Sequence, residues 1–330
     1  MKIRTKLFRR IRLVTIILLA VVLVPYGFSR VASSWRRLSV HSMLDLPAHD
    51  SDDAALRIAC YNIAHGRGLA TSNWRGGTAE ERKTRLAQIA DLLRALDADI
   101  IVLNEVDFDS SWSLSTNQAR YLAKQAGYRY WAEQRNLDFR ILTWKWRFGN
   151  AVLSRYPIIE ASVVDLPDFS SVETLFAGKK RGVNCTIDVN GEKLRIVGVH
   201  LSHRSEAIRA RSAEVITGIA SSDIVPTILA GDLNSSPSGF PHSQSDTDAG
   251  NAVDILDASS LFQRQPEQPS GSSAESTYHS TRPESIIDWI LVPRNWQILE
   301  YRVESPTLSD HRPVVVELSL ELVEDTATPK

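Results

Sequence analysis

Several segments of this chain are apolar like buried strands and end in residues that can carry chemistry. Residues 229–234, Leu-Ala-Gly-Asp-Leu-Asn, place Asp232 and Asn234 two positions apart after a glycine. Alternate side chains of an extended backbone point to the same face, so we expect both to share one space. Taken alone this is an ordinary turn after a strand. Three more apolar segments end in Asn62, Glu105 and His200, and this repetition predicts one site built from several strand ends.

Two further polar positions lie near the C-terminus. Asp288 interrupts an otherwise apolar strand, and Asp310 directly precedes His311. An aspartate in such a strand either lies at a half-exposed edge or, if it is buried, requires a partner. Pro313 disfavours helical backbone at the residue before it, so we expect the Asp310-His311 pair at the mouth of an extended strand.

The order of these positions resembles the endonuclease/exonuclease/phosphatase superfamily, which includes deoxyribonuclease I, abasic-site endonucleases, inositol polyphosphate 5-phosphatases and neutral sphingomyelinases. The matching positions are Asn62, Glu105, the block 149–157, His200, Asp232 with Asn234, Asp288, and Asp310 with His311. The alternation of strands, hairpins and helices is itself typical of an α/β fold. The resemblance implies a four-layer α/β/β/α sandwich of the deoxyribonuclease I-like type, preceded here by an N-terminal apolar helix.

The resemblance also implies a metal site. Mg²⁺ or Mn²⁺ is the expected cofactor, because both are hard cations that prefer oxygen ligands. Glu105 is the expected principal metal ligand, with Asn62 and Asp310 supporting it. Without the other motifs, Glu105 would be interpreted as a solvated charge at a strand end.

Catalytic roles follow from the same resemblance. His311 is expected to act as a general base or as a donor to the phosphoryl oxygen, with Asp288 as the carboxylate that orients it. His200 is expected to be a second acid or a phosphate-binding imidazole. Either Asp232, with Asn234 beside it, or His311 activates the water, and the sequence leaves this choice open.

Some side chains have more than one interpretation. Arg181 either contacts the substrate phosphate or is an exposed arginine that follows two lysines. Trp144 and Trp146 alternate with basic residues, a pattern that suits base stacking, a lipid interface or core packing. Asn104 stands where abasic-site endonucleases usually have glutamine, and no tyrosine can be assigned near the phosphate. A dedicated DNA-repair enzyme is therefore disfavoured.

The N-terminus differs from the rest of the chain. Six basic residues within 1–12 precede an apolar stretch over 13–32, which predicts either a membrane anchor or a cleaved signal segment. We favour the anchor; cleavage would make the protein secreted. The basic charge predicts that residues 1–12 stay in the cytoplasm and that the domain is exported. Residues 33–54 are predicted to be a tether to the catalytic domain, 55–320, and 321–330 a C-terminal tail.

Local signals predict individual elements. Thr78 followed by Glu81 forms a capping box at the start of a helix. Further helices are expected over 117–126 and 205–220, and Asn190-Gly191 predicts a β-hairpin. Cys60 and Cys185 lie in strand-like runs, so we expect buried hydrophobes rather than a disulfide or a metal site.

The leading hypothesis is metal-dependent hydrolysis of a phosphodiester or phosphomonoester by an activated water. The substrate is open among nucleic acid, a phospholipid headgroup and a small phosphorylated solute. A formal net charge of −1 argues against strong nonspecific binding to nucleic acid. The alternative is a non-catalytic, membrane-tethered binding protein on the same fold, which ranks lower because no acid, amide or imidazole of the matched set is missing. The sequence assigns no oligomeric state.

Overall fold

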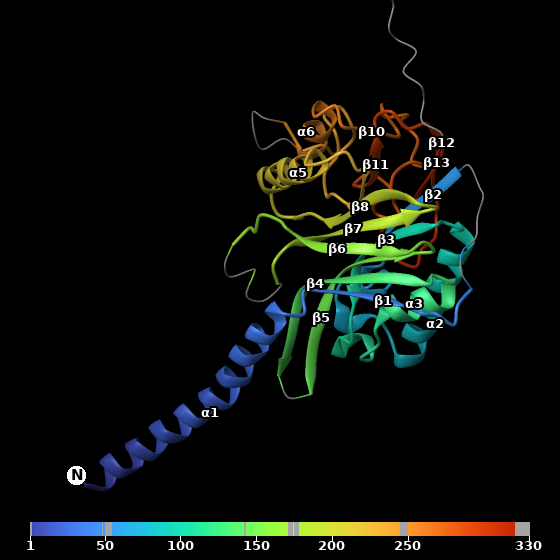
Figure 1. Ribbon diagram of the computed structural model, residues 1–330. Coiled ribbons are helices and arrows are strands. Elements are labelled where there is room, and N and C mark those ends of the chain that lie inside the picture. The colour runs from blue at the N-terminus through green and yellow to red at the C-terminus, as the bar shows by residue number, and fades with distance from the viewer. Residues whose placement is uncertain are drawn as a thin grey trace, which may run out of the picture.

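Two β-sheets face each other in the computed structural model, which describes residues 2–47, 49, 55–141, 143–170, 174, 178–244 and 250–320. Helices cover the outer face of each sheet, and a long N-terminal helix projects from this body (Figure 1). The predicted four-layer sandwich with an apolar helix ahead of it is confirmed.

Seven strands of the described chain form the first sheet, in the order β1-β4-β5-β3-β2-β13-β12. β2 and β3 pair in parallel, and the other neighbours pair antiparallel. The bounds are β1 (Leu38–Ser42), β2 (Ala55–Asn62), β3 (Ile100–Asp107), β4 (Tyr130–Ile141), β5 (Trp144–Ser154), β12 (Ile298–Val303) and β13 (Val314–Ser319).

Six strands of the described chain form the second sheet, in the order β10-β11-β9-β8-β7-β6. Here β8 and β9 are the parallel pair. The bounds are β6 (Ile158–Asp165), β7 (Arg181–Val189), β8 (Glu192–His200), β9 (Thr227–Asp232), β10 (Phe262–Arg264) and β11 (Asp288–Pro293). Each sheet therefore holds one parallel pair, and this pair supplies two of the strand ends that the sequence singles out.

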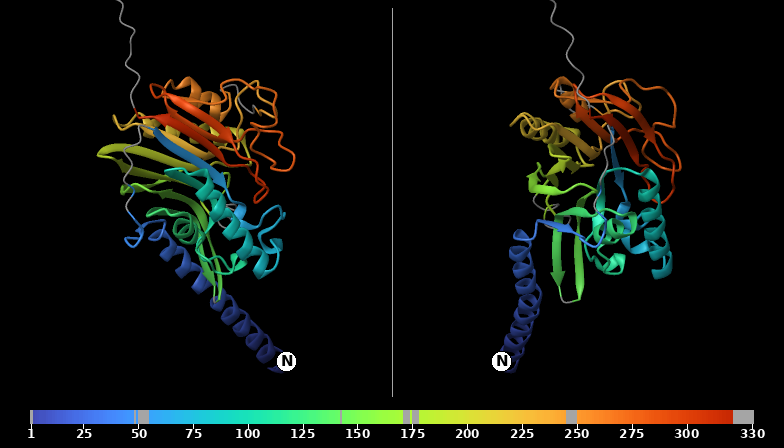
Figure 2. Two further views of the ribbon diagram at one scale, coloured as in Figure 1. Left: turned by 90° about the vertical axis from the view of Figure 1, so that its right-hand side faces the viewer. Right: turned by 45° about the vertical axis from the view of Figure 1, so that its right-hand side comes forward.

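The main core lies between the sheets, because alternate strand residues point inward. Ile58 and Val102 of the first sheet pack there with Ile196, Ile228 and Ile290 of the second, all of them buried. Separate apolar layers join α2 and α3 to the first sheet and α5 and α6 to the second. The two views in Figure 2 show the helices outside the sheets. The helix bounds are α2 (Ala79–Leu96), α3 (Gln118–Ala126), α5 (Glu206–Ala220) and α6 (Ala252–Ala258).

The predicted local signals are confirmed. Thr78 and Glu81 form both hydrogen bonds of a capping box at the start of α2. Asn117 caps α3, and β7 and β8 form the hairpin around Asn190-Gly191. Both cysteines are buried and free.

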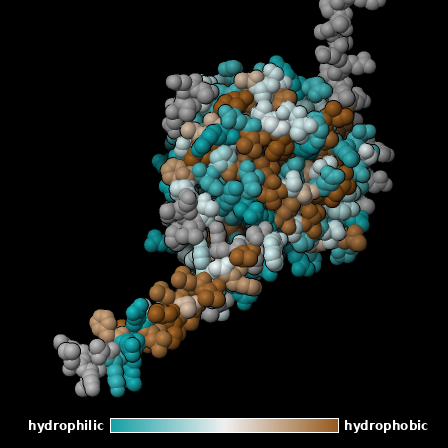
Figure 3. All heavy atoms as spheres, turned by 60° about the vertical axis from the view of Figure 1, so that its left-hand side comes forward, coloured by the Kyte–Doolittle hydropathy of each residue, from teal (hydrophilic) through white to brown (hydrophobic). Residues whose placement is uncertain are grey.

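The N-terminal helix α1 (Lys2–Ser34) contains an apolar stretch, Phe8–Ser29, that is long enough to cross a membrane by length and composition. Most of this stretch is exposed, and its last turn contacts the folded body. Figure 3 shows it as a mostly hydrophobic rod with hydrophilic residues near its N-terminal end.

The segment 33–54, predicted to be a tether, contains a strand of the first sheet. Leu38–Ser42 forms β1, which pairs with β4 at the edge of the first sheet. A polar edge strand of five residues has no alternating apolar pattern strong enough to be recognised in the sequence.

Gly231 permits the close approach of β9 to β8. A Cβ at this position would lie 2.1 Å from the carbonyl oxygen of Val199 and 3.0 Å from Oδ1 of Asn104, and its φ is +134°. Only glycine fits here without a shift of the backbone. The glycine therefore keeps Asp232 beside His200, its register partner in β8.

Gly231→Ala is expected to lower the free energy of unfolding by about 2–4 kcal/mol, because backbone strain and overpacking both apply. Gly191→Ala is the matched control, since Gly191 also has a positive φ but an added Cβ would meet no atom within 4 Å. Chemical unfolding of the full chain, followed by circular dichroism, measures both variants. Equal losses would show that the contact with Val199 contributes nothing.

Candidate active site

Strand ends from both sheets meet at one edge of the sandwich. The parallel registers pair Asn62 with Asn104 in the first sheet and His200 with Asp232 in the second. Asp288, the first residue of β11, lies opposite Asp232 in the antiparallel ladder. Because parallel strands end at the same edge, their last side chains gather there.

Asn104 connects the two sheets beneath this site. Its Oδ1 accepts a hydrogen bond from the backbone N–H of Asp232 at 2.9 Å. Its amide group donates to the carbonyl oxygen of Val199 at 2.9 Å and to Oδ1 of Asn150 at 2.8 Å. The asparagine that departs from the pattern of abasic-site endonucleases therefore positions the catalytic edge.

Asp232 is buried and held by amide groups. The side chain of Asn62 donates to its Oδ2 at 3.0 Å, and the backbone N–H of Asn234 donates to its Oδ1 at 2.9 Å. Asn234 has a φ of +50°, and its side chain donates to the carbonyl oxygen of Leu201 at 3.2 Å. The predicted pairing of Asp232 with Asn234 thus occurs through the backbone of Asn234, while its side chain reaches the end of β8.

His311 lies between two carboxylates. Its Nδ1 is 2.9 Å from Oδ2 of Asp288, and its Nε2 is 3.7 Å from Oδ2 of Asp232. Nε2 of His200 approaches the same oxygen of Asp232 to 3.5 Å. Ligand atoms of Asp232, Asp288 and His311 all lie within 4.8 Å of one another, which also makes this group a candidate acidic and histidine metal site. The partner expected for the buried Asp288 is His311.

Burial and neighbouring charges shift the pKa values of Asp232, His311 and His200 in different directions. Burial raises the pKa of the Asp232 carboxyl to about 7, against the opposing charge of His311. Burial disfavours the imidazolium of His311, but the carboxylates of Asp288 and Asp232 outweigh it and raise its pKa to about 10. Burial, reinforced by the charge of Lys180, holds the pKa of His200 well below its ordinary value. At neutral pH the site therefore holds a protonated His311 beside an Asp232 poised to gain or lose a proton.

Glu105 and Asp310 form a second carboxylate group, around Arg67. The Arg67 guanidinium lies 2.9 Å from Oε2 of Glu105 and 2.9 Å from Oδ2 of Asp310. Burial disfavours the Glu105 carboxylate, but the charges of His65 and Arg67 contribute to holding its pKa far below the ordinary range. Glu105 has a φ of +51° at a register shift of β3, a bulge that redirects its side chain.

His65 and Arg67 were not found from the sequence. Nδ1 of His65 lies 2.8 Å from Oδ1 of Asp107, and its Nε2 lies 3.4 Å from Glu105. Both residues belong to the irregular turn after β2, where Ala64 and His65 have positive φ. No periodicity marks such a turn, although its motif His-Gly-Arg follows Asn62 closely.

Tyr278 is the other residue that the sequence did not identify. Its ring centroid lies 4.9 Å from that of His311, and the two residues form an isolated β-bridge. The long loop 265–287 that carries Tyr278 has no helical or strand pattern. A tyrosine therefore does lie beside the site.

Arg181 makes its side-chain contacts with residues outside the candidate site. Its guanidinium pairs with Asp165 at 3.2 Å and donates to the backbone oxygens of Arg135 and Asn136. Asp165 is the register partner of Arg181 between β6 and β7, which places the two opposite charges together. The alternative interpretation, an exposed arginine, does not describe it, because its side chain is only 12% exposed.

A small cavity of about 150 Å³ adjoins the site. Its lining includes Glu105, His200 and His65 of the site together with Lys180 and Phe169. This combination of charge and an aromatic ring suits a phosphorylated group with an organic substituent.

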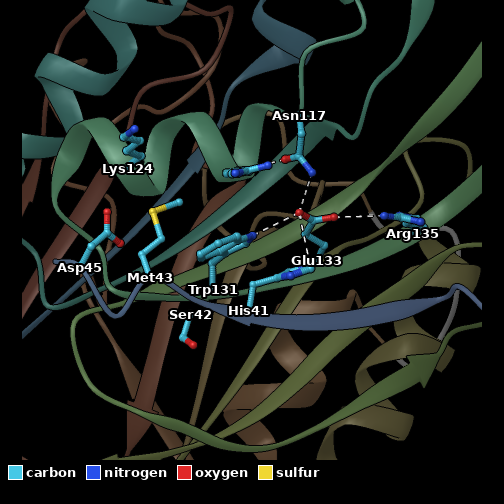
Figure 4. A pocket seen from close by; sticks show the side chains of 10 residues that line it. His41, Ser42, Met43, Asp45, Asn117, Lys124, Trp131, Glu133 and Arg135 are labelled. Atoms are coloured by element: carbon cyan, nitrogen blue, oxygen red, sulfur yellow. Dashed lines mark hydrogen bonds and ion pairs between the residues drawn. The ribbon is translucent and has the colours of Figure 1, made fainter.

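A larger cavity, of about 440 Å³, lies elsewhere, where β1 and α3 meet β4. Figure 4 shows Glu133 at its centre, and this carboxylate accepts hydrogen bonds from Asn117 at 2.7 Å, Trp131 at 3.1 Å and Arg135 at 3.1 Å. None of the residues that line it belongs to the predicted site. Because its central carboxylate is fully occupied by protein partners, we assign this cavity no chemistry.

A family model described as the endonuclease/exonuclease/phosphatase family matches residues 59–311. This match spans most of the chain, and the protein belongs to that family. Members of the family are hydrolases that act on phosphoester bonds, and they typically depend on a divalent metal. A search of curated proteins finds no match.

Solved structures share this fold. An endonuclease/exonuclease/phosphatase from Beutenbergia cavernae is 20% identical with a TM-score of 0.59, over 80% of this chain and 71% of that one. A mannosyl-6-phosphatase from Bacteroides thetaiotaomicron is 19% identical with a TM-score of 0.55, over 80% and 99%. The catalytic domain of human Nocturnin with bound sulfate is 15% identical with a TM-score of 0.56, over 86% and 97%. At such identities these likenesses show the fold.

Proposed function

We propose that this protein is a metal-dependent phosphoesterase whose catalytic domain is exported and held at a membrane. The observation that carries the proposal is the chain of contacts from Asp288 through His311 to Asp232 at the edge where the strand ends meet. A carboxyl group whose pKa lies near neutral pH can accept a proton from water, and an imidazolium of fixed orientation beside it can stabilise the phosphoryl oxygens.

The residues divide the proton transfers between them. Asp232, with a pKa of about 7, takes a proton from water as the water oxygen bonds to phosphorus. His311, protonated at neutral pH, donates a hydrogen bond to a phosphoryl oxygen, and Asp288 fixes its ring through Nδ1. The bond from phosphorus to the leaving oxygen breaks, and that oxygen takes up a proton from solvent. Asp232 rather than His311 is therefore the base in this proposal.

Glu105, Asp310 and Asn62 would hold Mg²⁺ or Mn²⁺. The fit rests on their chemistry: two carboxylates and an amide supply hard oxygen donors, and Glu105 stays ionised. The two carboxylates already surround a cation, the guanidinium of Arg67. When bound, the metal neutralises charge on the phosphoryl oxygens.

The N-terminal helix supports the location. Phe8–Ser29 spans about 33 Å at about 1.5 Å per residue, against a bilayer core of about 30 Å. Lys2, Arg4 and Lys6 precede this stretch, and three further arginines lie within its first turns, at positions 9, 10 and 12. This basic charge favours retention of the N-terminus in the cytoplasm and export of the domain. The substrate is then a phosphodiester or phosphomonoester met outside the cytoplasmic membrane: nucleic acid, a phospholipid headgroup or a small phosphorylated solute.

The full chain in detergent is expected to hydrolyse bis-p-nitrophenyl phosphate or p-nitrophenyl phosphate with Mg²⁺ or Mn²⁺, and to lose activity on addition of EDTA. Asp232→Asn should lower kcat by about 10²- to 10⁴-fold, because general-base catalysis is removed while the size of the side chain is kept. Asp188→Asn, in the β7–β8 hairpin, is the matched control and should keep the wild-type kcat. Absence of hydrolysis by the wild-type chain would favour the non-catalytic binding protein instead.

Arg67→Met is expected to strengthen Mn²⁺ binding at least tenfold, because the guanidinium competes with the metal for Glu105 and Asp310. Isothermal titration of the full chain measures this affinity without any substrate. Arg85→Met is the control, since Arg85 donates to the backbone oxygens of Gly66 and Gly76. An unchanged or weaker affinity in Arg67→Met would contradict competition and would instead indicate that Arg67 helps to orient the metal ligands.

A further inference from the structure

The hairpin formed by β4 and β5 extends beyond the rest of the first sheet. It projects from the folded body on the side where α1 leaves it, as Figure 1 and the right-hand view of Figure 2 both show. A register shift between Arg135 and Leu137 marks the point beyond which the two strands continue as a ribbon. Among the residues that the structure describes, no third strand pairs with the outer part of this ribbon.

The outer part of this hairpin contacts the end of the apolar stretch of α1. The rings of Tyr26 and Phe139 lie 5.4 Å apart, and the backbone N–H of Arg140 donates to Oγ of Ser29 at 2.9 Å. Tyr26 and Ser29 occupy the last turn of the stretch Phe8–Ser29. If that stretch crosses the bilayer core, these contacts place the end of the hairpin at the level of the lipid headgroups.

Four indole rings form a continuous aromatic ridge along the hairpin, made of Trp74, Trp112, Trp144 and Trp146. Successive centroids are 5.9 Å apart for Trp74 and Trp112, 6.0 Å for Trp74 and Trp144, and 6.2 Å for Trp112 and Trp146. Trp144 and Trp74 are 57% and 56% exposed. Tryptophan side chains concentrate at membrane interfaces because the ring is apolar and its N–H is polar.

Basic residues accompany the ridge. Arg140 and Lys145 lie opposite each other at the end of the hairpin. Protein segments that bind at membrane interfaces combine positive charge with exposed indole rings, and the positive charge attracts the phosphates of the headgroups. The same combination would suit single-stranded nucleic acid. The position of the ridge beside the exposed apolar helix favours the membrane, because a lipid surface covers both features at once.

The inner end of the ridge reaches the active site. Nε1 of Trp112 donates to Oδ2 of Asp107 at 2.7 Å, and Oδ1 of Asp107 lies 2.8 Å from Nδ1 of His65. His65 in turn contacts Glu105 at 3.4 Å. Unbroken contacts therefore lead from the exposed Trp144 to a predicted metal ligand.

We propose that the aromatic ridge lies in the headgroup layer of the membrane that α1 spans, and that the site acts on phosphodiesters of phospholipids in that layer. This proposal rests on the proposed function. Water adds to the lipid phosphorus, the bond to one of its two alcohols breaks, and that alcohol leaves with a proton. A substrate held in the membrane would approach Glu105 along the ridge rather than from solution.

Full-length protein in phosphatidylcholine and phosphatidylglycerol vesicles tests the depth of the ridge, because α1 anchors every variant equally. Brominated acyl chains quench tryptophan fluorescence at short range. All variants carry Trp35→Phe, because Trp35 directly follows α1 and is exposed. Trp74→Phe combined with Trp144→Phe should lose most of the quenching. Trp296→Phe, at a buried position between β11 and β12, should keep it. Equal quenching in both would overturn the proposal.

Hydrolysis provides the second readout. Trp74→Ala with Trp144→Ala should lower the hydrolysis of vesicle phospholipid, measured from both the released headgroup and the remaining lipid, several-fold more than it lowers hydrolysis of bis-p-nitrophenyl phosphate. Ile224→Ser, at a fully exposed position before β9, removes an apolar side chain elsewhere and should not change this ratio. A ratio that is the same in both variants would overturn the proposal.

The two proposals fail in different ways. A wild-type chain that hydrolyses neither the soluble ester nor lipid with Mg²⁺ or Mn²⁺ contradicts the proposed function. A chain that hydrolyses the soluble ester and DNA but no vesicle phospholipid, with the DNA rate lowered by the tryptophan substitutions, makes the ridge a nucleic-acid surface and overturns the membrane assignment.

Discussion

The buried amide of Asn104 fixes the two sheets relative to each other, and every other feature of the site depends on that. Its hydrogen bonds join β3 to the backbone of Asp232 and Val199 in the facing sheet. Apolar packing alone would tolerate small sliding of one sheet over the other, whereas a buried polar group left without its partner costs about 1–3 kcal/mol. Gly231 leaves the room that this contact needs. Glu105, which follows Asn104 directly, is thereby placed at the same edge as Asp232.

The carboxylates gathered at this edge are separated into two groups by two different cations. Arg67 lies between Glu105 and Asp310, and His311 lies between Asp232 and Asp288. A guanidinium keeps its proton at any physiological pH. A metal ion can therefore bind the same carboxylates only by displacing the guanidinium, which suits a metal site. An imidazolium can exchange its proton, which suits catalysis. The choice of cation therefore fits the proposed division of this acidic edge into a metal subsite at Arg67 and a proton-transfer subsite at His311.

Residues at the ends of regular strands were predictable from the sequence, because an apolar run that stops at a polar residue marks both the strand and its functional end. Asn62, Glu105 and Asp232 were found in this way. Asn62 and Asp232 do end their strands, whereas Glu105 lies at a bulge inside β3, which continues to Asp107. Arg67 and Tyr278 were missed because an irregular turn and a long loop place them, and no period reveals such backbone. Strand pairing was also not predictable. The sequence does not reveal that Asp165 lies opposite Arg181 and pairs with it. The edge strand β1 is too short and polar to be distinguished from a linker.

The proposed chemistry rests on two buried carboxylates that keep His311 protonated while Asp232 titrates near neutrality. An NMR titration of the ring nitrogens of His311 in the full chain measures this directly. We expect His311 to stay protonated through neutral pH and to lose its proton near pH 10. In Asp288→Asn its pKa should fall, because the nearest negative charge is gone. A wild-type His311 that titrates near 6.5, its ordinary value, would contradict the account.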